Sequence, residues 1–159
     1  MNKRLVIKKV IAKLTGELEV YFRAAEYARA EATHEQNKAE HKYDTRGLEA
    51  SYLARGQSKQ AAELEAAITE FERLGGKKFA ASDPIDVGAL VELEQSDETA
   101  LYFLGPRAGG TEIEHDKKEI LVITPQSPLG AQLVGRRYGD DLELRLGSET
   151  RRAKILSVQ

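Results

Sequence analysis

The N-terminal third of the chain has a regular spacing of apolar residues. From Ile7 onward they recur in alternating steps of four and three through nearly four heptads. The positions are Ile7, Ile11, Leu14, Leu18, Tyr21, Ala25, Ala28 and Ala32. This spacing is typical of a helix with a coiled-coil seam. Because large residues give way to alanines along the seam, we expect a partner helix to approach more closely toward its far end.

A second run with the same spacing predicts that partner within residues 48–74. Its seam positions are Gln57, Ala61, Leu64, Ile68 and Phe71. Between the runs the periodicity lapses in HKYDTRGLEASY, where Gly47 offers a break. We therefore predict an antiparallel coiled-coil hairpin over residues 1–76, with its tip at 43–49. Gly75 and Gly76 end the second helix.

Beyond residue 77 the pattern changes to short runs rich in Val, Ile, Leu and Tyr, separated by Gly, Asp, Ser and Pro. We expect antiparallel strands at 88–95, 99–105, 118–124, 141–147 and 151–158. One short helix interrupts them, with Ser127 as its cap and Pro128 at its first position. Leu129, Leu133 and Val134 are expected to face inward, and Gly135 to end the turn. The fold class is therefore α+β, with a second domain at 77–159.

Composition and charge narrow the possible functions. Lys and Arg number 24 against 26 acidic residues, and the net charge of −2 gives no general reason for tight binding to duplex DNA. The chain has no cysteine, and its three histidines lack metal-ligand spacing, so a cytoplasmic setting is expected. Lysines interrupt the apolar start before a signal peptide could form, and we expect no contact with a membrane.

The run ITPQSPLGAQLVGRRYGDDLEL, preceded by VGALVELEQSDETALYFLG, resembles the C-terminal domain of the Gre transcription elongation factors. In that family an Ile or Val strand is followed by Ser-Pro, a short helix and Gly-Asp. The N-terminal coiled coil stands in the same order, so the resemblance covers nearly the whole chain. It implies an FKBP-like fold for the C-terminal domain.

The resemblance also implies a function. A Gre-like factor binds bacterial RNA polymerase at the secondary channel and stimulates cleavage of backtracked nascent RNA by the polymerase active site, without being an enzyme itself. The implied docking residues are Gln126, Ser127, Pro128 and Leu129, with Gln126 where the family commonly has Asp or Asn. We expect a monomer that contacts nascent RNA only indirectly, within the elongation complex.

The hairpin tip carries the implied chemistry. The family places an Asp, a Glu three residues later and then a Tyr; here Asp44 is followed by Gly47 at that offset, and Glu49 precedes Tyr52. Asp44 and Glu49 are the candidate ligands for a magnesium ion shared with the polymerase active centre, and the protein alone is expected to bind no cofactor. The same residues also suit ordinary helix roles, Asp44 as an N-cap and Glu49 as a first-turn acid.

Several alternatives follow from the same residues. The changed tip spacing leaves open a channel-binding regulator or antagonist that stimulates no cleavage. The implied fold leaves open a prolyl isomerase, although only Phe79 and Phe103 are available in that domain to wall a proline pocket. Basic residues could contact RNA phosphates at the tip, and polymerase or nucleic acid in the second domain, although mixed charges on an exposed helix, as at the tip, usually serve only solubility. They are Lys38, His41, Lys42 and Arg46 near the tip, and Arg136, Arg137, Arg151 and Arg152 in the second domain.

Overall fold

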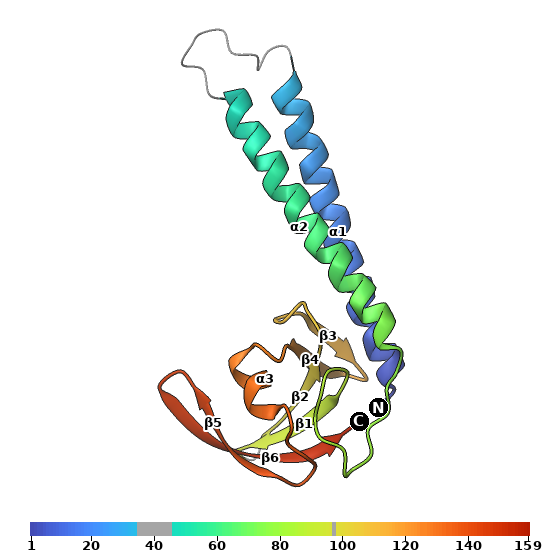
Figure 1. Ribbon diagram of the computed structural model, residues 1–159, viewed down its shortest axis with the longest axis vertical. Helices are drawn as coiled ribbons and strands as arrows, with labels where there is room; N and C mark the ends of the chain where they lie inside the picture. Colours follow the sequence, from blue (N-terminus) through green and yellow to red (C-terminus); the bar gives the residue numbers. More distant parts are fainter. Residues whose placement is uncertain (35–45, 97) are drawn as a thin grey trace. The chain divides into compact units, whose positions relative to one another are not determined.

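A computed structural model describes residues 1–34, 46–96 and 98–159 of the chain (Figure 1). These residues form two compact units. One comprises Ala12–Ile68, and the other combines Met1–Ile11 with Thr69–Gln159. The composition changes near residue 77, but the base of both long helices belongs to the same unit as the strands.

The unit Ala12–Ile68 is a helical hairpin made of α1 (Lys3–Thr33) and α2 (Arg46–Leu74). The two helices lie side by side and antiparallel, and the Arg29 guanidinium donates a hydrogen bond to the Ser58 hydroxyl across them (3.1 Å). The predicted seam is the buried side. Its buried members are Leu14, Ala25, Ala28 and Ala61, and its half-buried members are Leu18, Tyr21, Leu64 and Ile68. Ala67 is also buried, which the strict spacing did not predict.

The start of α2 differs from the expected tip. The helix begins at Arg46, so Gly47 lies inside its first turn and does not break it. A glycine is tolerated there because first-turn N–H groups have no partner within the helix in any case. Of the predicted tip at 43–49, residues 43–45 lie outside the described residues.

The second unit contains a six-stranded sheet in the order β3-β4-β2-β1-β6-β5. The strands are β1 (Leu90–Gln95), β2 (Glu98–Leu104), β3 (Glu112–His115), β4 (Lys118–Ile123), β5 (Asp141–Leu146) and β6 (Glu149–Val158). Five of them match predicted strands, while β3 was not predicted. The α+β class and the order of a helical hairpin followed by strands with one short helix are confirmed.

The sheet is mixed, so the prediction of a wholly antiparallel sheet was wrong. β2 and β4 are parallel, with Phe103 opposite Val122, and the other four pairings are antiparallel. The cause is β3, which pairs with β4 at the edge of the sheet through a tight turn at Asp116 and Lys117, both with positive φ. After β2 the chain first forms the edge strand β3 and then reverses at this turn. β4 therefore enters the sheet between β3 and β2 and runs in the same direction as β2.

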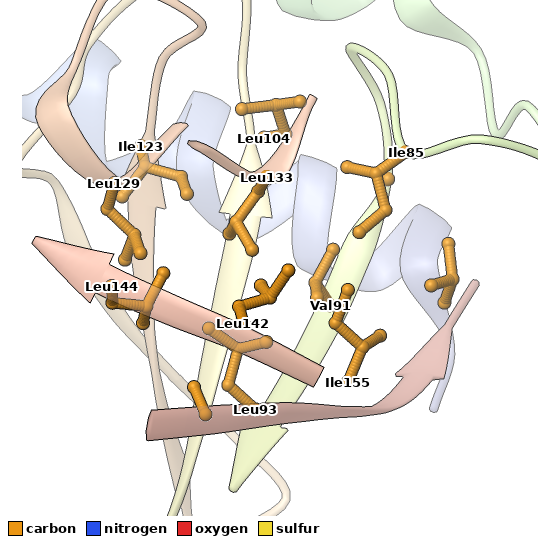
Figure 2. Packing of buried hydrophobic residues seen from close by; sticks show 13 residues of the cluster. Ile85, Val91, Leu93, Leu104, Ile123, Leu129, Leu133, Leu142, Leu144 and Ile155 are labelled. Carbon is orange, nitrogen blue, oxygen red and sulfur yellow. The ribbon is translucent and has the colours of Figure 1, made fainter. Parts of the chain in front are cut away.

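One face of the sheet holds the main hydrophobic core (Figure 2). Side chains from β1, β2, β4, β5 and β6 meet there with Leu129 and Leu133 of the short helix α3 (Pro128–Leu133). The cluster comprises Ile85, Ala89, Val91, Leu93, Leu104, Ile123, Leu129, Leu133, Leu142, Leu144, Ala153, Ile155 and Val158. Val134, predicted to face inward, is instead the extended C-cap of α3 and is 42% exposed. The prediction failed because the helix stops one residue before it.

Phe71, in the last turns of α2, packs on another part of the sheet. Its ring stacks on Phe103 of β2, with 6.1 Å between centroids, and both residues are fully buried. Gly105 leaves room for this contact, because a Cβ there would lie 2.8 Å from the Phe71 ring and 3.0 Å from Val122. In the same unit, Val6 and Val10 of α1 are fully buried.

Lys3 is a buried cation in this unit. The residue is 9% exposed, and its ammonium lies 4.6 Å from the centre of the Phe79 ring. Among the described residues its Nζ has no hydrogen-bond partner. Burial, with a smaller contribution from the Lys77 charge, lowers the pKa of Lys3 to about 8. Ring contact therefore only partly replaces the water that this ammonium loses.

We expect Gly105→Ala to destabilise the protein by roughly 1–3 kcal/mol, because the added methyl group overpacks the Phe71–Phe103 contact. Urea unfolding measures the change. Gly16→Ala is the matched control, since a Cβ at Gly16 of α1 meets nothing within 4 Å. It should stabilise the helix by about 0.5–1 kcal/mol. Equal effects of the two substitutions would contradict the packing argument.

Lys3→Met should stabilise the protein at pH 7 by up to about 3 kcal/mol, because it removes a buried charge whose pKa is lowered from 10.5 to about 8. Between those pH values the unfolded chain binds a proton that the folded chain has lost, so the parent's stability rises with pH. The variant's advantage should therefore be complete below pH 8 and disappear toward pH 10.5. Urea unfolding at several pH values measures both effects.

Lys8→Met, at an exposed position of the same helix, is the control and should keep the parent's pH dependence. A Lys3→Met advantage that is the same at every pH would mean that improved packing, and not loss of the charge, is responsible.

Candidate functional site

The Ser-Pro segment forms a rigid turn at the start of α3. The Ser127 hydroxyl accepts a hydrogen bond from the Gly130 N–H (3.0 Å) and donates one to the Thr124 carbonyl (2.7 Å). Pro128 occupies the first helical position, as predicted. Ser127 is thus the N-cap, and its hydroxyl is already engaged within the fold.

The four predicted docking residues are brought together in this turn, but they face different ways. Gln126 and Pro128 are exposed, Ser127 is half-buried, and Leu129 belongs to the hydrophobic core. Ser127 and Leu129 therefore shape the turn, while Gln126 and Pro128 supply its surface.

Gly130 is required by the close approach of the chain to itself. A Cβ at this position would overlap the Thr124 carbonyl oxygen and crowd the Ser127 hydroxyl. The glycine stands in the SPLG segment of the sequence, but its role depends on this tertiary approach.

Gln132 joins α3 to the edge strand β5, a role that no pattern in the sequence indicated. Its amide nitrogen donates to the carbonyls of Pro128 (2.7 Å) and Arg145 (3.1 Å). Its amide oxygen accepts from the Arg145 N–H (2.8 Å). One side chain therefore satisfies both backbone groups of Arg145 and fixes the helix that presents Pro128.

The four arginines predicted as a possible contact surface of the second domain lie in two separate segments of the chain. Arg136 and Arg137 follow α3 in the turn that leads into β5. Arg151 and Arg152 lie on β6 opposite Leu144 and Glu143, in the middle of β5. The Arg151 guanidinium also pairs with Glu149 (2.6 Å).

The predicted metal ligands are not brought together within the described residues. Asp44 lies outside them, as do Lys38, Glu40, His41 and Lys42. Glu49 lies in the first turn of α2, where only its backbone is described. One turn further on, Tyr52 is 62% exposed, and the Arg55 guanidinium lies 6.0 Å from the centre of its ring. Across residues 1–34, 46–96 and 98–159, no group of three or more acidic or histidine side chains could hold a metal ion.

The two aromatic residues available for a proline pocket are both engaged elsewhere. Phe103 is fully buried against Phe71. Phe79 packs against the main core, with the ammonium groups of Lys3 and Lys77 over its ring. Surface hollows of about 400 and 610 Å³ exist on the sheet, but neither Phe lines them. This arrangement disfavours a prolyl isomerase.

No described helix has the length and apolar character needed to cross a membrane.

Comparison with known proteins identifies a relationship for the second unit. Residues 80–159 match the family model described as transcription elongation factor, GreA/GreB, C-term. No curated protein matches the chain.

Similar solved structures include GreA factor homolog 1 (Gfh1) of Thermus thermophilus, 22% identical over 94% of each chain with a TM-score of 0.39. Gfh1 of Thermus aquaticus is 22% identical over 92% of each chain, with a TM-score of 0.41. A GreA/GreB factor of Nitrosomonas europaea is 20% identical over 62% of this chain and 78% of its own, with a TM-score of 0.34.

We expect Gln132→Glu to destabilise the protein by about 1–3 kcal/mol, because a carboxylate oxygen would then face the Pro128 and Arg145 carbonyls without a proton to donate. Urea unfolding at pH 7 measures this. The exposed Gln126→Glu makes the same chemical change in the same segment and should leave stability within about 0.5 kcal/mol of the parent. If the two variants are equally stable, Gln132 does not secure the turn.

Proposed function

Because the chain belongs to the GreA/GreB family of transcription elongation factors, we propose that it binds RNA polymerase at the secondary channel and stimulates cleavage of backtracked nascent RNA. Gre-family factors act on RNA polymerase and are not enzymes themselves. The family match over residues 80–159 carries this proposal. The helical hairpin that precedes the matched region supports it.

The chain offers separate places for docking and for chemistry. The turn at the start of α3 is held by the Ser127 cap, by Gly130 and by the Gln132 amide, so it presents Gln126 and Pro128 with little conformational freedom to lose on binding. We assign docking to this surface. The start of α2 lies more than 70 residues earlier in the chain and in the other unit, and we assign the effect on chemistry to it.

Asp44 and Glu49 flank the start of α2 at Arg46 and would supply carboxylate oxygens there. Such ligands suit magnesium, which prefers oxygen donors at about 2.1 Å and retains several waters. A magnesium ion shared with the polymerase would activate a water or stabilise the leaving oxygen. Two carboxylates are an incomplete set of ligands, so the polymerase must provide the remainder.

A second function is favoured by the local sequence of the tip. Gly47 stands three residues after Asp44, where the family has a Glu, and it lies in the first turn of α2. Glu49 is two residues further along the helix than Gly47. Position 49 is therefore rotated by roughly 200° about the helix axis relative to position 47. A protein with this tip could occupy the channel and regulate transcription without stimulating cleavage.

The Asp44→Asn, Glu49→Gln double variant separates binding from chemistry. Both replacements keep the size of the side chain and remove its charge, so magnesium recruitment should be lost while the seam of the hairpin is unchanged. We expect the variant to bind polymerase with the parent's affinity, to compete with it, and to lose stimulation of RNA cleavage on a backtracked complex.

Glu40→Gln is the control, because it removes an acid near the same tip that is not assigned to the metal. It should cleave like the parent. Full cleavage by the double variant would refute the metal assignment. A parent protein that binds and competes but never stimulates cleavage would establish the regulator instead.

A further inference from the structure

The turn that follows α3 has a firmly held backbone. The Ile85 N–H donates to the Arg136 carbonyl (2.7 Å), and the Gly135 N–H donates to the Ile85 carbonyl (2.8 Å). At its other end, the Gly139 N–H donates to the Ile155 carbonyl (2.9 Å), and the Ile155 N–H donates to the Asp140 carbonyl (3.0 Å). The turn is thus tied at both ends to neighbouring segments and is preorganised.

The larger side chains of this turn point away from the fold. Val134 is 42% exposed and Tyr138 is 56% exposed, and both Arg136 and Arg137 are exposed. Within the described part of the chain, neither guanidinium is paired with a carboxylate. The adjacent Asp140 carboxylate accepts a hydrogen bond from the Arg137 backbone N–H instead (2.9 Å). A rigid backbone therefore displays two arginines and a tyrosine that the fold itself does not use.

We propose that the exposed turn Val134–Tyr138 is a second polymerase-binding element, which takes a protein segment carrying carboxylates beside apolar side chains. This inference rests on the proposed function, since it extends the docking surface assigned to Gln126 and Pro128. The two surfaces are joined by the six residues of α3.

The chemistry of the turn selects this kind of partner. Arginine forms two parallel hydrogen bonds with a carboxylate, and arginine and tyrosine are enriched among the residues that dominate protein interfaces. Phosphates of RNA could also bind arginine. Pro128 at the first position of α3 and Val134 directly after the helix favour protein, because an exposed aliphatic surface gains little from a phosphate backbone.

The chain provides a matched control for the test. Arg136→Glu, Arg137→Glu and Arg151→Glu, Arg152→Glu make the same change in net charge at two exposed arginine pairs of one unit. Affinity for core RNA polymerase free of nucleic acid is measured for the full-length variants, with urea unfolding as a check on folding. We expect the first variant to lose about tenfold or more in affinity and the second to stay within about twofold. Tyr138→Ser, which leaves the charge unchanged, should also weaken binding.

Equal losses in the two arginine variants would indicate a general charge effect and overturn the proposal. The proposal would also be overturned if the Arg136→Glu, Arg137→Glu variant bound core RNA polymerase with the parent's affinity. So would a loss of affinity for a single-stranded RNA oligonucleotide with polymerase affinity unchanged, since the turn would then be an RNA contact.

Pro128→Glu distinguishes this inference from the proposed function. If Pro128→Glu weakens polymerase binding and the Arg136→Glu, Arg137→Glu variant does not, only the inference about the turn fails. If the parent itself does not bind polymerase, the proposed function fails.

Discussion

The stacking of Phe71 on Phe103 is the contact on which the organisation of the strand-containing unit depends. Phe71 belongs to the hairpin by sequence, and its partner belongs to the central strand β2. Because two fully buried aromatic side chains contribute several kcal/mol in a well-packed core, the last turns of α2 cannot be treated as a linker. The Glu70–Arg107 ion pair (2.6 Å) lies beside it but is exposed and therefore contributes little. Aromatic packing thus explains why Thr69–Leu74 belongs to the same unit as the strands.

Polar side chains control the two edges of the sheet. At β5, Gln132 occupies both backbone groups of Arg145, and at β3 the Lys9 ammonium donates to the Glu114 carbonyl (2.6 Å). Unpaired edge groups are the usual sites of unwanted strand pairing, so these side chains discourage association of one sheet with another. The same Gln132 amide also holds α3. Protection of the β5 edge and the position of the turn that we propose for docking therefore depend on one residue.

Features encoded by local pattern could be predicted from the sequence, and features that depend on distant contacts could not. The hairpin seam follows from a repeat of four and three, and the start of α3 follows from Ser127 and Pro128. β3 was missed because its four residues, EIEH, contain one aliphatic side chain, and its turn at Asp116–Lys117 lacks glycine. Without β3, the parallel pairing of β2 and β4 could not be inferred.

In the candidate site, too, features set by local sequence could be predicted and features set by distant contacts could not. The resemblance to the family pointed to a docking segment, and the apolar pattern correctly predicted that Leu129 faces inward, but neither could reveal that Gln132 reaches Arg145. Nor could the sequence place Arg151 and Arg152 opposite Leu144 and Glu143, since that depends on the register of β5 with β6. The tip remains a prediction from sequence, because Asp44 lies outside the described residues.

The position of β6 between β1 and β5 has a consequence for the order of folding. β6 pairs with β1 through contacts such as Val91 with Val158, which join residues far apart in the chain. The seam of α1 and α2 instead closes across a short connection, with residue 29 meeting residue 58. Folding slows as contacting residues become more distant in sequence. We therefore expect the helical hairpin to form early and the pairing of β6 with β1 to form later. The turn between α3 and β5, in which Gly139 and Asp140 hydrogen-bond to Ile155 of β6, therefore becomes ordered only after β6 has paired.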